Sequence, residues 1–140
     1  MTLPKAVISD LDGTLAIHTD RDPYNTAECE KDAVNRGLLE IIKALRKTDT
    51  HIILVSGRED QFREHTTRWL VKHEIPHDWL YMRPTGDMRS DVIIKKEIYE
   101  AHIKGKYTVL GVFDDRKRIK RMWVENGIQV FDLNQTDVEF

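Results

Sequence analysis

Apolar and polar positions follow two different periods along this chain of 140 residues. Continuous apolar runs of a few residues are typical of strands that are buried on both faces of a parallel sheet. Five such runs lie at Lys5–Asp10, His51–Val55, Trp79–Met82, Tyr107–Phe113 and Ile128–Phe131. Their spacing predicts five strands, separated by segments long enough to hold helices.

The segments between these runs carry apolar residues at helical spacing. One helix face is formed by Leu38, Ile41, Ile42 and Leu45, and another by Phe62, Thr66, Trp69, Leu70 and His73. Asn35 and Ser90 are suited to cap helices that begin after them, and Gly127 is suited to end a helix. Regular alternation of strands and helices predicts an α/β protein with a three-layer Rossmann-like fold and a mostly parallel five-stranded sheet.

Polar residues and one glycine directly follow several of the predicted strands. They are Asp10, Asp12, Ser56, Gly57, Arg58, Asp114 and Asp115. In an open parallel sheet, ligands bind beyond the carboxyl ends of the strands, and these ends meet at one edge. We therefore expect these residues to lie together in one site.

The first polar motif, Asp10–Thr14, places two carboxylates one residue apart. Carboxylates at that distance repel each other unless a cation lies between them. An Asp-rich turn after a strand is the alternative interpretation. Together with Asp114 and Asp115, the motif makes a hard-oxygen site, for which Mg²⁺ is the natural ion. No group of cysteine and histidine has the spacing of a zinc site.

Two further positions favour phosphate binding. Ser56 and Gly57 offer a hydroxyl and free backbone N–H groups between a strand and a helix, although an ordinary turn explains them equally well. Lys95 lies near the start of a helix, where a cation is disfavoured unless it reaches an anion at the sheet edge. Asp91, four residues earlier, is placed to orient this ammonium group, and a solvated ion pair is the alternative. Lys96 points about 100° away around the helix.

A basic segment follows Asp114 and Asp115. We expect one of these carboxylates to face the metal, while the other caps a helix or holds its neighbours. The cations of the segment are Arg116, Lys117, Arg118, Lys120 and Arg121. The segment is interpreted as a solvated helix face or, alternatively, as a local patch for a polyanion beside the active edge.

Composition limits the remaining classes of function. The chain is 40% hydrophobic and 33% charged, which suits a single domain over residues 1–140. Its net charge of -2 excludes a global positive field for nucleic acid, so any basic surface is local. Cys29 is a single cysteine, and no long apolar segment is present. Both features favour a cytoplasmic protein with no internal disulfide and no membrane span.

The order of these motifs resembles the haloacid dehalogenase (HAD) superfamily of phosphohydrolases. The four motifs that carry the resemblance are Asp10-x-Asp12-Gly13-Thr14, Ser56, Lys95 and Asp114-Asp115. A closer resemblance is to the 3′-phosphatase domain of bacteriophage polynucleotide kinase–phosphatase. It rests on Arg21–Tyr24, Val55–Glu59, Gly86–Asp91 and Asp114–Arg116, together with Met122-Trp123. It extends from about Val7 to Gly127, with a shorter segment than the family's between Glu59 and Arg68.

The resemblance implies catalytic roles for the first motif. Asp10 would be the nucleophile that forms an aspartyl-phosphate, and Asp12 would be the general acid and then the general base. Mg²⁺ would be held by Asp10, by the backbone carbonyl of Asp12 and by Asp114, and it would neutralise charge between two anions.

The resemblance also implies roles for the other positions. Ser56, Gly57 and Lys95 would hold the phosphoryl oxygens and stabilise the charged transition state. Arg21 and Arg58 would contact the substrate or its phosphate. The remaining two carboxylates, those of Asp91 and Asp115, would brace the site.

The implied reaction is the removal of a 3′-phosphate from the ends of DNA or RNA, as in end healing during repair. The alternative is a HAD phosphatase that acts on a small nucleotide, another phosphomonoester or a phosphoprotein. Only about 20 residues separate Thr14 from the helix near Asn35. This leaves room for a minimal cap, and an open site favours a chain end or a protein-borne phosphate as substrate.

Further expectations concern partners, location and other classes of protein. The chain lacks the G-x-x-x-x-G-K-[ST] loop of the family's kinase half, so no kinase domain is expected, and a kinase or ligase would be a separate or fused partner. A phage-encoded protein would act in the host cytoplasm. A phospho-acceptor module of the response-regulator type is disfavoured, because its acceptor aspartate ends the third strand, where this chain has Met82-Arg83. A binding domain without catalysis is disfavoured because all four motifs are intact.

Overall fold

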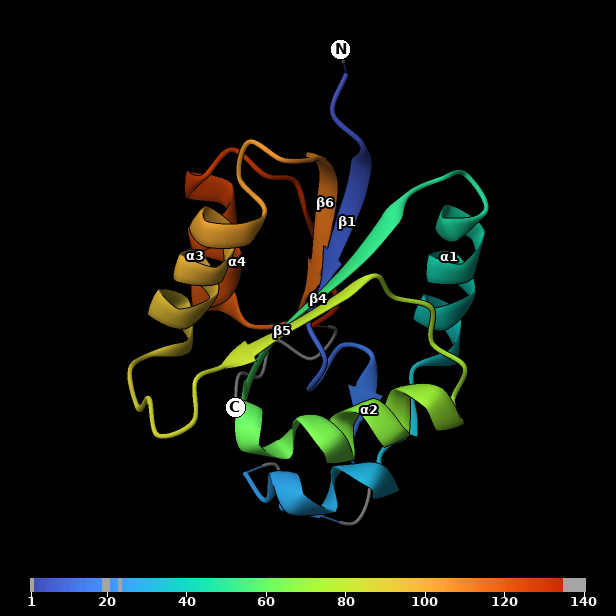
Figure 1. Cartoon of the computed structure of the whole chain (residues 1–140), viewed down its shortest axis with the longest axis vertical. Coiled ribbons are helices and arrows are strands. Elements are labelled where there is room, and N and C mark those ends of the chain that lie inside the picture. Colours follow the sequence, from blue (N-terminus) through green and yellow to red (C-terminus); the bar gives the residue numbers. More distant parts are fainter. Residues whose placement is uncertain (1, 19–20, 23, 135–140) are drawn as a thin grey trace.

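A computed structural model of the chain describes residues 2–18, 21–22 and 24–134 (Figure 1). Its strands are β1 (Lys5–Ser9), β2 (Ala16–Ile17), β3 (Ala33–Val34), β4 (His51–Glu59), β5 (Trp79–Arg83), β6 (Thr108–Asp114) and β7 (Val130–Asp132). Its α-helices are α1 (Arg36–Arg46), α2 (Arg63–Lys72), α3 (Asp91–His102) and α4 (Lys117–Glu125), and two 3₁₀ helices are η1 (Thr26–Lys31) and η2 (Asp60–Phe62).

Within the described residues, the main sheet has five parallel strands in the order β5-β4-β1-β6-β7. The predicted α/β fold is therefore confirmed. β1 is central, and the backbone N–H of Asp10, just past its end, donates to the carbonyl of Phe113 in β6 at 3.0 Å. Asp10 consequently lies between the carboxyl ends of β4 and β6.

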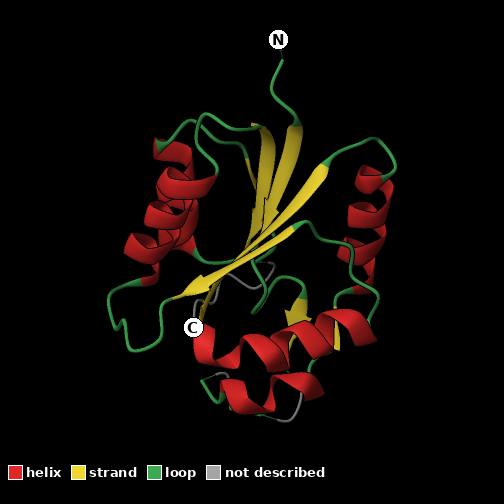
Figure 2. Cartoon of the chain, viewed as in Figure 1, coloured by secondary structure: helices red, strands yellow, loops and turns green. Residues whose placement is uncertain are grey.

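Helices cover both faces of the sheet, as Figure 2 shows. Alternate residues of β1 point to opposite faces. Ala6 and Ile8 pack in a core with α3 and α4, while Val7 packs in a second core with α1 and α2. The strands are apolar on both faces because each face is covered, and this is why continuous apolar runs located them.

Two predicted helix starts are found where the capping residues indicated. The side chain of Asn35 accepts from the backbone N–H of Leu38 at 3.2 Å at the start of α1. The side chain of Ser90 accepts from the N–H of Val92 at 3.2 Å at the start of α3. In the part of the chain that the structure describes, no helix is both long enough and apolar enough to span a bilayer.

Apart from shifts of one or two residues at strand ends, the structure differs from the expected elements in two places. β4 continues to Glu59 instead of ending at Val55, and its pairing with β5 shifts register between Ser56 and Glu59. The run of apolar side chains ends at Val55. Strand pairing depends on backbone groups, and it therefore continues through the polar residues that follow. Between β1 and α1 the chain also forms η1 and a ribbon of β2 and β3, which no apolar period indicated. We call residues 11–34 the cap segment.

Candidate active site

Three buried carboxylates converge beyond the end of β1. Asp10, Asp114 and Asp115 are 5%, 1% and 6% exposed, and one oxygen of each lies within 4.8 Å of the others. The Nζ atom of Lys95 donates to Asp10 Oδ1 at 2.8 Å and to Asp114 Oδ2 at 3.3 Å. The hydroxyl of Thr14 lies between Asp10 Oδ2 and Asp115 Oδ1, at 3.3 and 3.2 Å.

Burial and mutual repulsion dominate the electrostatics of these carboxylates. Burial raises the pKa of Asp10 well above its ordinary value; Lys95 opposes the rise, while Asp114 and Asp115 add to it. Burial and the neighbouring Asp114 also raise the pKa of Asp115. Burial would lower the pKa of Lys95, but Asp10 and Asp114 raise it, so the ammonium form is retained. The Lys95 ammonium thus contacts two of the three carboxylates, and this oxygen-rich cluster fits a hard divalent cation.

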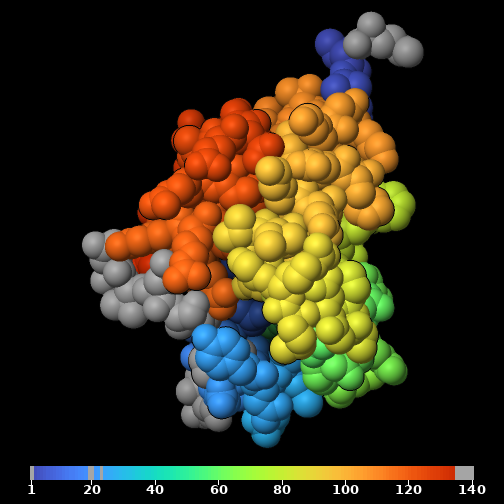
Figure 3. Space-filling view, turned by 90° about the vertical axis from the view of Figure 1, so that its left-hand side faces the viewer, coloured from blue at the N-terminus to red at the C-terminus, as the bar shows by residue number. Residues whose placement is uncertain are grey.

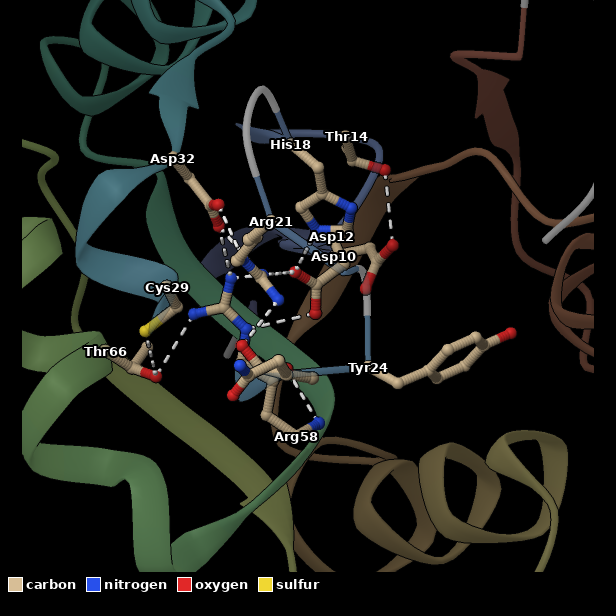
Figure 4. A network of polar contacts seen from close by, with 12 residues as sticks. Asp10, Asp12, Thr14, His18, Arg21, Tyr24, Cys29, Asp32, Arg58 and Thr66 are labelled. Atoms are coloured by element: carbon tan, nitrogen blue, oxygen red, sulfur yellow. Dashed lines mark hydrogen bonds and ion pairs between the residues drawn. The ribbon is translucent and has the colours of Figure 1, made fainter. Parts of the chain in front are cut away.

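Asp12 belongs to a second group of charges (Figure 4). Arg58 binds it in a bidentate manner, with Nη2 at 2.8 Å from Oδ1 and Nε at 3.0 Å from Oδ2. His18 Nε2 lies 2.8 Å from Oδ1, and Arg21 Nη2 donates to the same oxygen at 3.2 Å. Asp12 is thus held by three side chains on the cavity side of the cap segment.

The side chains that bind Asp12 also keep it ionised. Burial would raise its pKa, but the hydrogen bonds from His18 and Arg58 lower it well below the ordinary value of an aspartate. The carboxylate form suits a general base. For Asp12 to act as a general acid, it must first take up a proton, and a phosphate anion bound beside it favours that uptake.

Asp32 anchors both arginines. It is 3% exposed and accepts from Arg21 through two bonds, Nε to Oδ1 at 2.7 Å and Nη2 to Oδ2 at 2.9 Å. Nη2 of Arg58 donates to Oδ2 at 3.2 Å, and Nη1 donates to Thr66 of α2 at 3.1 Å. The cap segment, β4 and α2 are thereby joined through one buried cluster of charges.

Asp91 does not orient Lys95 as its spacing suggested. Its Oδ1 accepts from Nη2 of Arg83, and its Oδ2 accepts from Nη1 of Arg116 at 2.5 Å. The two guanidinium groups outcompete the ammonium because Lys95 is already held by Asp10 and Asp114. Asp91 therefore fixes two arginines at the rim of the site.

An open cavity of about 270 Å³ gives access to these groups. Figure 3 shows the face on which the light-blue cap segment, the yellow loop before α3 and the orange start of α4 surround a hollow. The predicted site residues that line the cavity are Asp10, Asp12, Gly57, Arg58, Asp91 and Lys95. Arg83, Arg89 and Arg116 also line its wall, together with the carboxylates of Glu59 and Asp87.

The structure places two predicted ligands of the phosphate or substrate away from the cavity wall. Ser56 is fully buried, and its Oγ accepts from the backbone N–H of Arg58 at 3.1 Å. Arg21 is 8% exposed, and its Nη1 also donates to the carbonyls of Asp22 and Asn25. Both residues hold the site together in this structure, and a direct contact with phosphate stays a prediction for each. Pro23 of the Arg21–Tyr24 element lies outside the described residues.

Sequence reasoning missed several functional side chains of the site. Arg83 ends β5 at the same edge of the sheet as Ser56 and Asp114, so the rule that located those two residues would also have found it. Asp32, His18 and Thr66 had no comparable signal, because they reach the site from the cap segment and from a helix face.

Gly57 provides a test of how tightly the rim is built. A Cβ atom at this position would lie 2.7 Å from Asp91 Oδ1, and Asp91 is pinned by two arginines. We expect Gly57→Ala to displace these arginines and to lower kcat/KM about 10- to 100-fold, as ångström-scale misplacement of catalytic groups does. Steady-state kinetics on a phosphomonoester would measure the decrease.

The matched control is Gly37→Ala in α1, where the nearest atom to a new Cβ lies at 3.7 Å. This change should stabilise α1 by about 0.5–1 kcal/mol and leave kcat/KM unchanged. Equal kinetics for the two alanine variants would contradict the tight packing of Gly57 against Asp91.

The chain is similar in sequence to known proteins. A family model described as the phosphatase domain of polynucleotide kinase PNKP matches residues 4–138. A putative bifunctional polynucleotide kinase/RNA ligase of Autographa californica nuclear polyhedrosis virus is 35% identical over 141 residues, which cover 98% of this chain and 20% of the viral protein. The chain thus spans about a fifth of the length of this curated relative.

Solved structures show the same fold. A chain from the Pnkp1/Rnl/Hen1 RNA repair complex shares 44% identity, with a TM-score of 0.93, and the match covers 97% of this chain and 44% of that one. A second structure of a Pnkp1/Rnl/Hen1 complex gives 43% identity, a TM-score of 0.94, and coverage of 99% and 48%. The class C acid phosphatase of Bacillus anthracis matches with a TM-score of 0.72 at 13% identity, over 99% of this chain and 69% of that one. This last match shows the fold alone.

Proposed function

Because the chain belongs to the family of polynucleotide kinase phosphatase domains of the HAD superfamily, we propose that it removes the 3′-phosphate from nucleic-acid ends. Membership of this family makes it a phosphomonoester hydrolase. The observation that carries the proposal is the position of Asp10, at the floor of an open cavity whose wall includes Arg83, Arg89 and Arg116. A phosphate at a chain end reaches such a site without being enclosed.

In the first step, an Asp10 oxygen attacks phosphorus and the bond from phosphorus to the 3′ oxygen breaks. The leaving oxygen takes a proton from Asp12, and Asp10 carries the phosphoryl group. In the second step, Asp12 accepts a proton from water as the water oxygen attacks phosphorus. Inorganic phosphate leaves and Asp10 is regenerated, so the proton count balances over the cycle.

Lys95 and the backbone of Gly57 would receive the phosphoryl oxygens. Lys95 is 2% exposed and lines the cavity beside Asp10, so its charge acts at low dielectric, where a preorganised donor stabilises a developing anion strongly. Lys95 also lowers the repulsion between Asp10 and an incoming phosphate. Asp114 and Asp115 keep this ammonium and Thr14 in position.

The carboxylate cluster supports a requirement for Mg²⁺. Asp10, Asp114 and the backbone carbonyl of Asp12 would hold the ion, which supplies charge neutralisation between the nucleophile and the phosphate. The cluster fits this ion because it is buried, consists of oxygen ligands and carries more negative charge than Lys95 neutralises.

Relatives and surface charge support a polynucleotide as the substrate. Similar proteins are a putative polynucleotide kinase/RNA ligase and a component of an RNA repair complex. Lys96, Arg118 and Arg121, together with Glu125, line a groove of about 360 Å³ between α3 and α4. These cations suit the phosphates upstream of the 3′ end. A kinase or ligase, fused or separate, would complete end healing.

The decisive experiment measures phosphate release, with Mg²⁺, from an oligonucleotide that carries a 3′-phosphate. A 5′-phosphorylated oligonucleotide and a 3′-nucleoside monophosphate serve as comparison substrates, and DNA and RNA versions are tested separately. We expect release from 3′ ends alone, and no release after EDTA removes the metal. Equal or faster release from the small monophosphate would overturn the nucleic-acid assignment while leaving the phosphatase chemistry in place.

The groove between α3 and α4 predicts a salt effect. For the double variant Arg118→Gln/Arg121→Gln, we expect a higher KM for a long 3′-phosphorylated oligonucleotide. The dependence of log(kcat/KM) on log salt should become shallower by about 0.7 for each phosphate of a single strand that the groove no longer neutralises.

The matched control removes the same charge elsewhere, through Lys47→Gln/Lys72→Gln at the C-terminal ends of α1 and α2. It should leave the salt dependence as in the unmodified protein. An equal change in both double variants would show that net charge, and not this groove, steers the substrate.

A further inference from the structure

The cavity has an apolar feature that the phosphatase chemistry does not use. Among the described residues, the two most exposed large hydrophobic side chains are those of Met88, at 85%, and Tyr24, at 77%. Both line the cavity that contains Asp10 and Lys95. Scattered apolar residues are ordinary on a surface, but these two lie at the same charged site and come from segments far apart in the sequence.

Hydrogen bonds from neighbouring side chains hold the backbone around Tyr24 in place. Nη1 of Arg21 donates to the carbonyls of Asp22 and Asn25, at 3.2 and 3.1 Å. Oδ1 of Asp22 accepts from the backbone N–H of Tyr24 at 2.9 Å. In Figure 4 the Tyr24 ring points away from the Arg21–Arg58 cluster.

Met88 is held in the same manner in the loop between β5 and α3. Nη1 of Arg83 donates to the carbonyls of Asp87 and Arg89, the residues on either side of Met88. The Arg89 side chain in turn binds Asp87 and Glu97. One guanidinium group therefore fixes the backbone on both sides of each apolar side chain, that of Arg21 for Tyr24 and that of Arg83 for Met88. The exposure of the two side chains is thus determined by the fold.

We propose that Tyr24 and Met88 form a clamp that receives the nucleobase of the nucleotide carrying the phosphate. The inference rests on the proposed function and adds how the terminal nucleotide is recognised. An aromatic ring and a polarisable thioether both pack well against the flat face of a base. Since every base has such a face, the clamp accepts all bases, while a sugar phosphate or a phosphoprotein gains nothing from it.

The test pairs a change in the protein with a change in the substrate. Two oligonucleotides carry a 3′-phosphate, one with a normal terminal nucleotide and the other with an abasic terminal nucleotide. In the unmodified protein, kcat/KM should be about tenfold higher for the first substrate, in the range of base–aromatic stacking. Tyr24→Ala should remove this preference, mainly by raising KM for the normal substrate, with little effect on the abasic one.

Three comparison variants sharpen the result. Tyr24→Phe keeps the ring and should keep the preference. Met88→Ala should weaken the preference to a smaller extent. Val71→Ala, at a side chain that is 69% exposed on α2 and outside the cavity lining, should behave as the unmodified protein with both substrates.

Several results would overturn the clamp. An equal loss of activity on both substrates in Tyr24→Ala would mean that Tyr24 only supports the cap segment. Unchanged kinetics on both substrates would show that Tyr24 does not contact the base, and a contact with a protein partner would then explain why the two side chains are exposed. If the unmodified protein released phosphate from neither oligonucleotide, but did so from a small phosphomonoester, the proposed substrate would fail together with the clamp.

Discussion

Asp10→Asn is expected to abolish phosphate release, with a decrease of at least about 10⁴-fold in kcat, because an amide does not attack phosphorus. The change keeps the shape of the side chain and removes the charge from a buried group whose pKa burial and Asp114 already raise. Lys95 keeps Asp114 as a partner, so the fold should be retained. Phosphate release from a 3′-phosphorylated oligonucleotide would measure the decrease.

A second readout separates the nucleophile from a supporting role. Acid quenching during turnover, followed by mass spectrometry, should find one covalent phosphoryl group on the unmodified protein and none on Asp10→Asn. Asp49→Asn provides the matched control, because Asp49 is exposed and has a φ of 59° that asparagine adopts readily. Turnover by Asp10→Asn above about a hundredth of the normal rate would rule out this residue as the nucleophile.

Asp32→Asn is expected to lower the free energy of unfolding by about 3–5 kcal/mol, the cost of leaving a buried partner charge uncompensated. Asp32 makes three hydrogen bonds to Arg21 and Arg58, and its side chain has no exposed surface. The amide replaces one acceptor oxygen by a donor that faces these guanidinium groups. Urea denaturation, followed by circular dichroism, measures the change.

Activity should fall in the same variant even under conditions where it stays folded. Arg58 loses one of its anchors, and Arg58 positions Asp12. The control is Glu28→Gln in η1, whose carboxylate lies 3.5 Å from the exposed Lys31; it should change stability by about 0.5 kcal/mol or less. Similar stabilities for Asp32→Asn and Glu28→Gln would contradict the central role assigned to Asp32.

The carboxylates at the sheet edge were predictable because each of them is tied to the end of a strand. Asp10 and Asp114 follow apolar runs, and the fold brings the ends of those runs together. Lys95 was found because a lysine in the first turns of a helix needs an anion, and Asp10 provides one. These predictions used the residue types at the ends of strands and helices, together with the rule that parallel strands end at one edge of the sheet.

The partners of the arginines were not predictable in this way. Arg21 and Arg58 were expected at the substrate, and that contact stays a prediction; in the structure Asp12 and Asp32 bind both guanidinium groups, while Arg58 also lines the cavity. Which carboxylate meets which guanidinium depends on the course of the cap segment, where apolar periodicity is lacking. The same reason explains the unexpected β2–β3 ribbon.

The fastening of the cap segment has a consequence for motion. Asp32 binds Arg58 of β4, and its carbonyl accepts from Nε1 of the fully buried Trp69 in α2 at 2.9 Å. A lid that opened in each catalytic cycle would have to break these bonds every time. We therefore expect the amides of η1 and β3 to exchange with deuterium about as slowly as those of β1 and β4, as one cooperative unit. In such an enzyme the site would already be open in the folded structure, and lid closure would not limit the turnover rate.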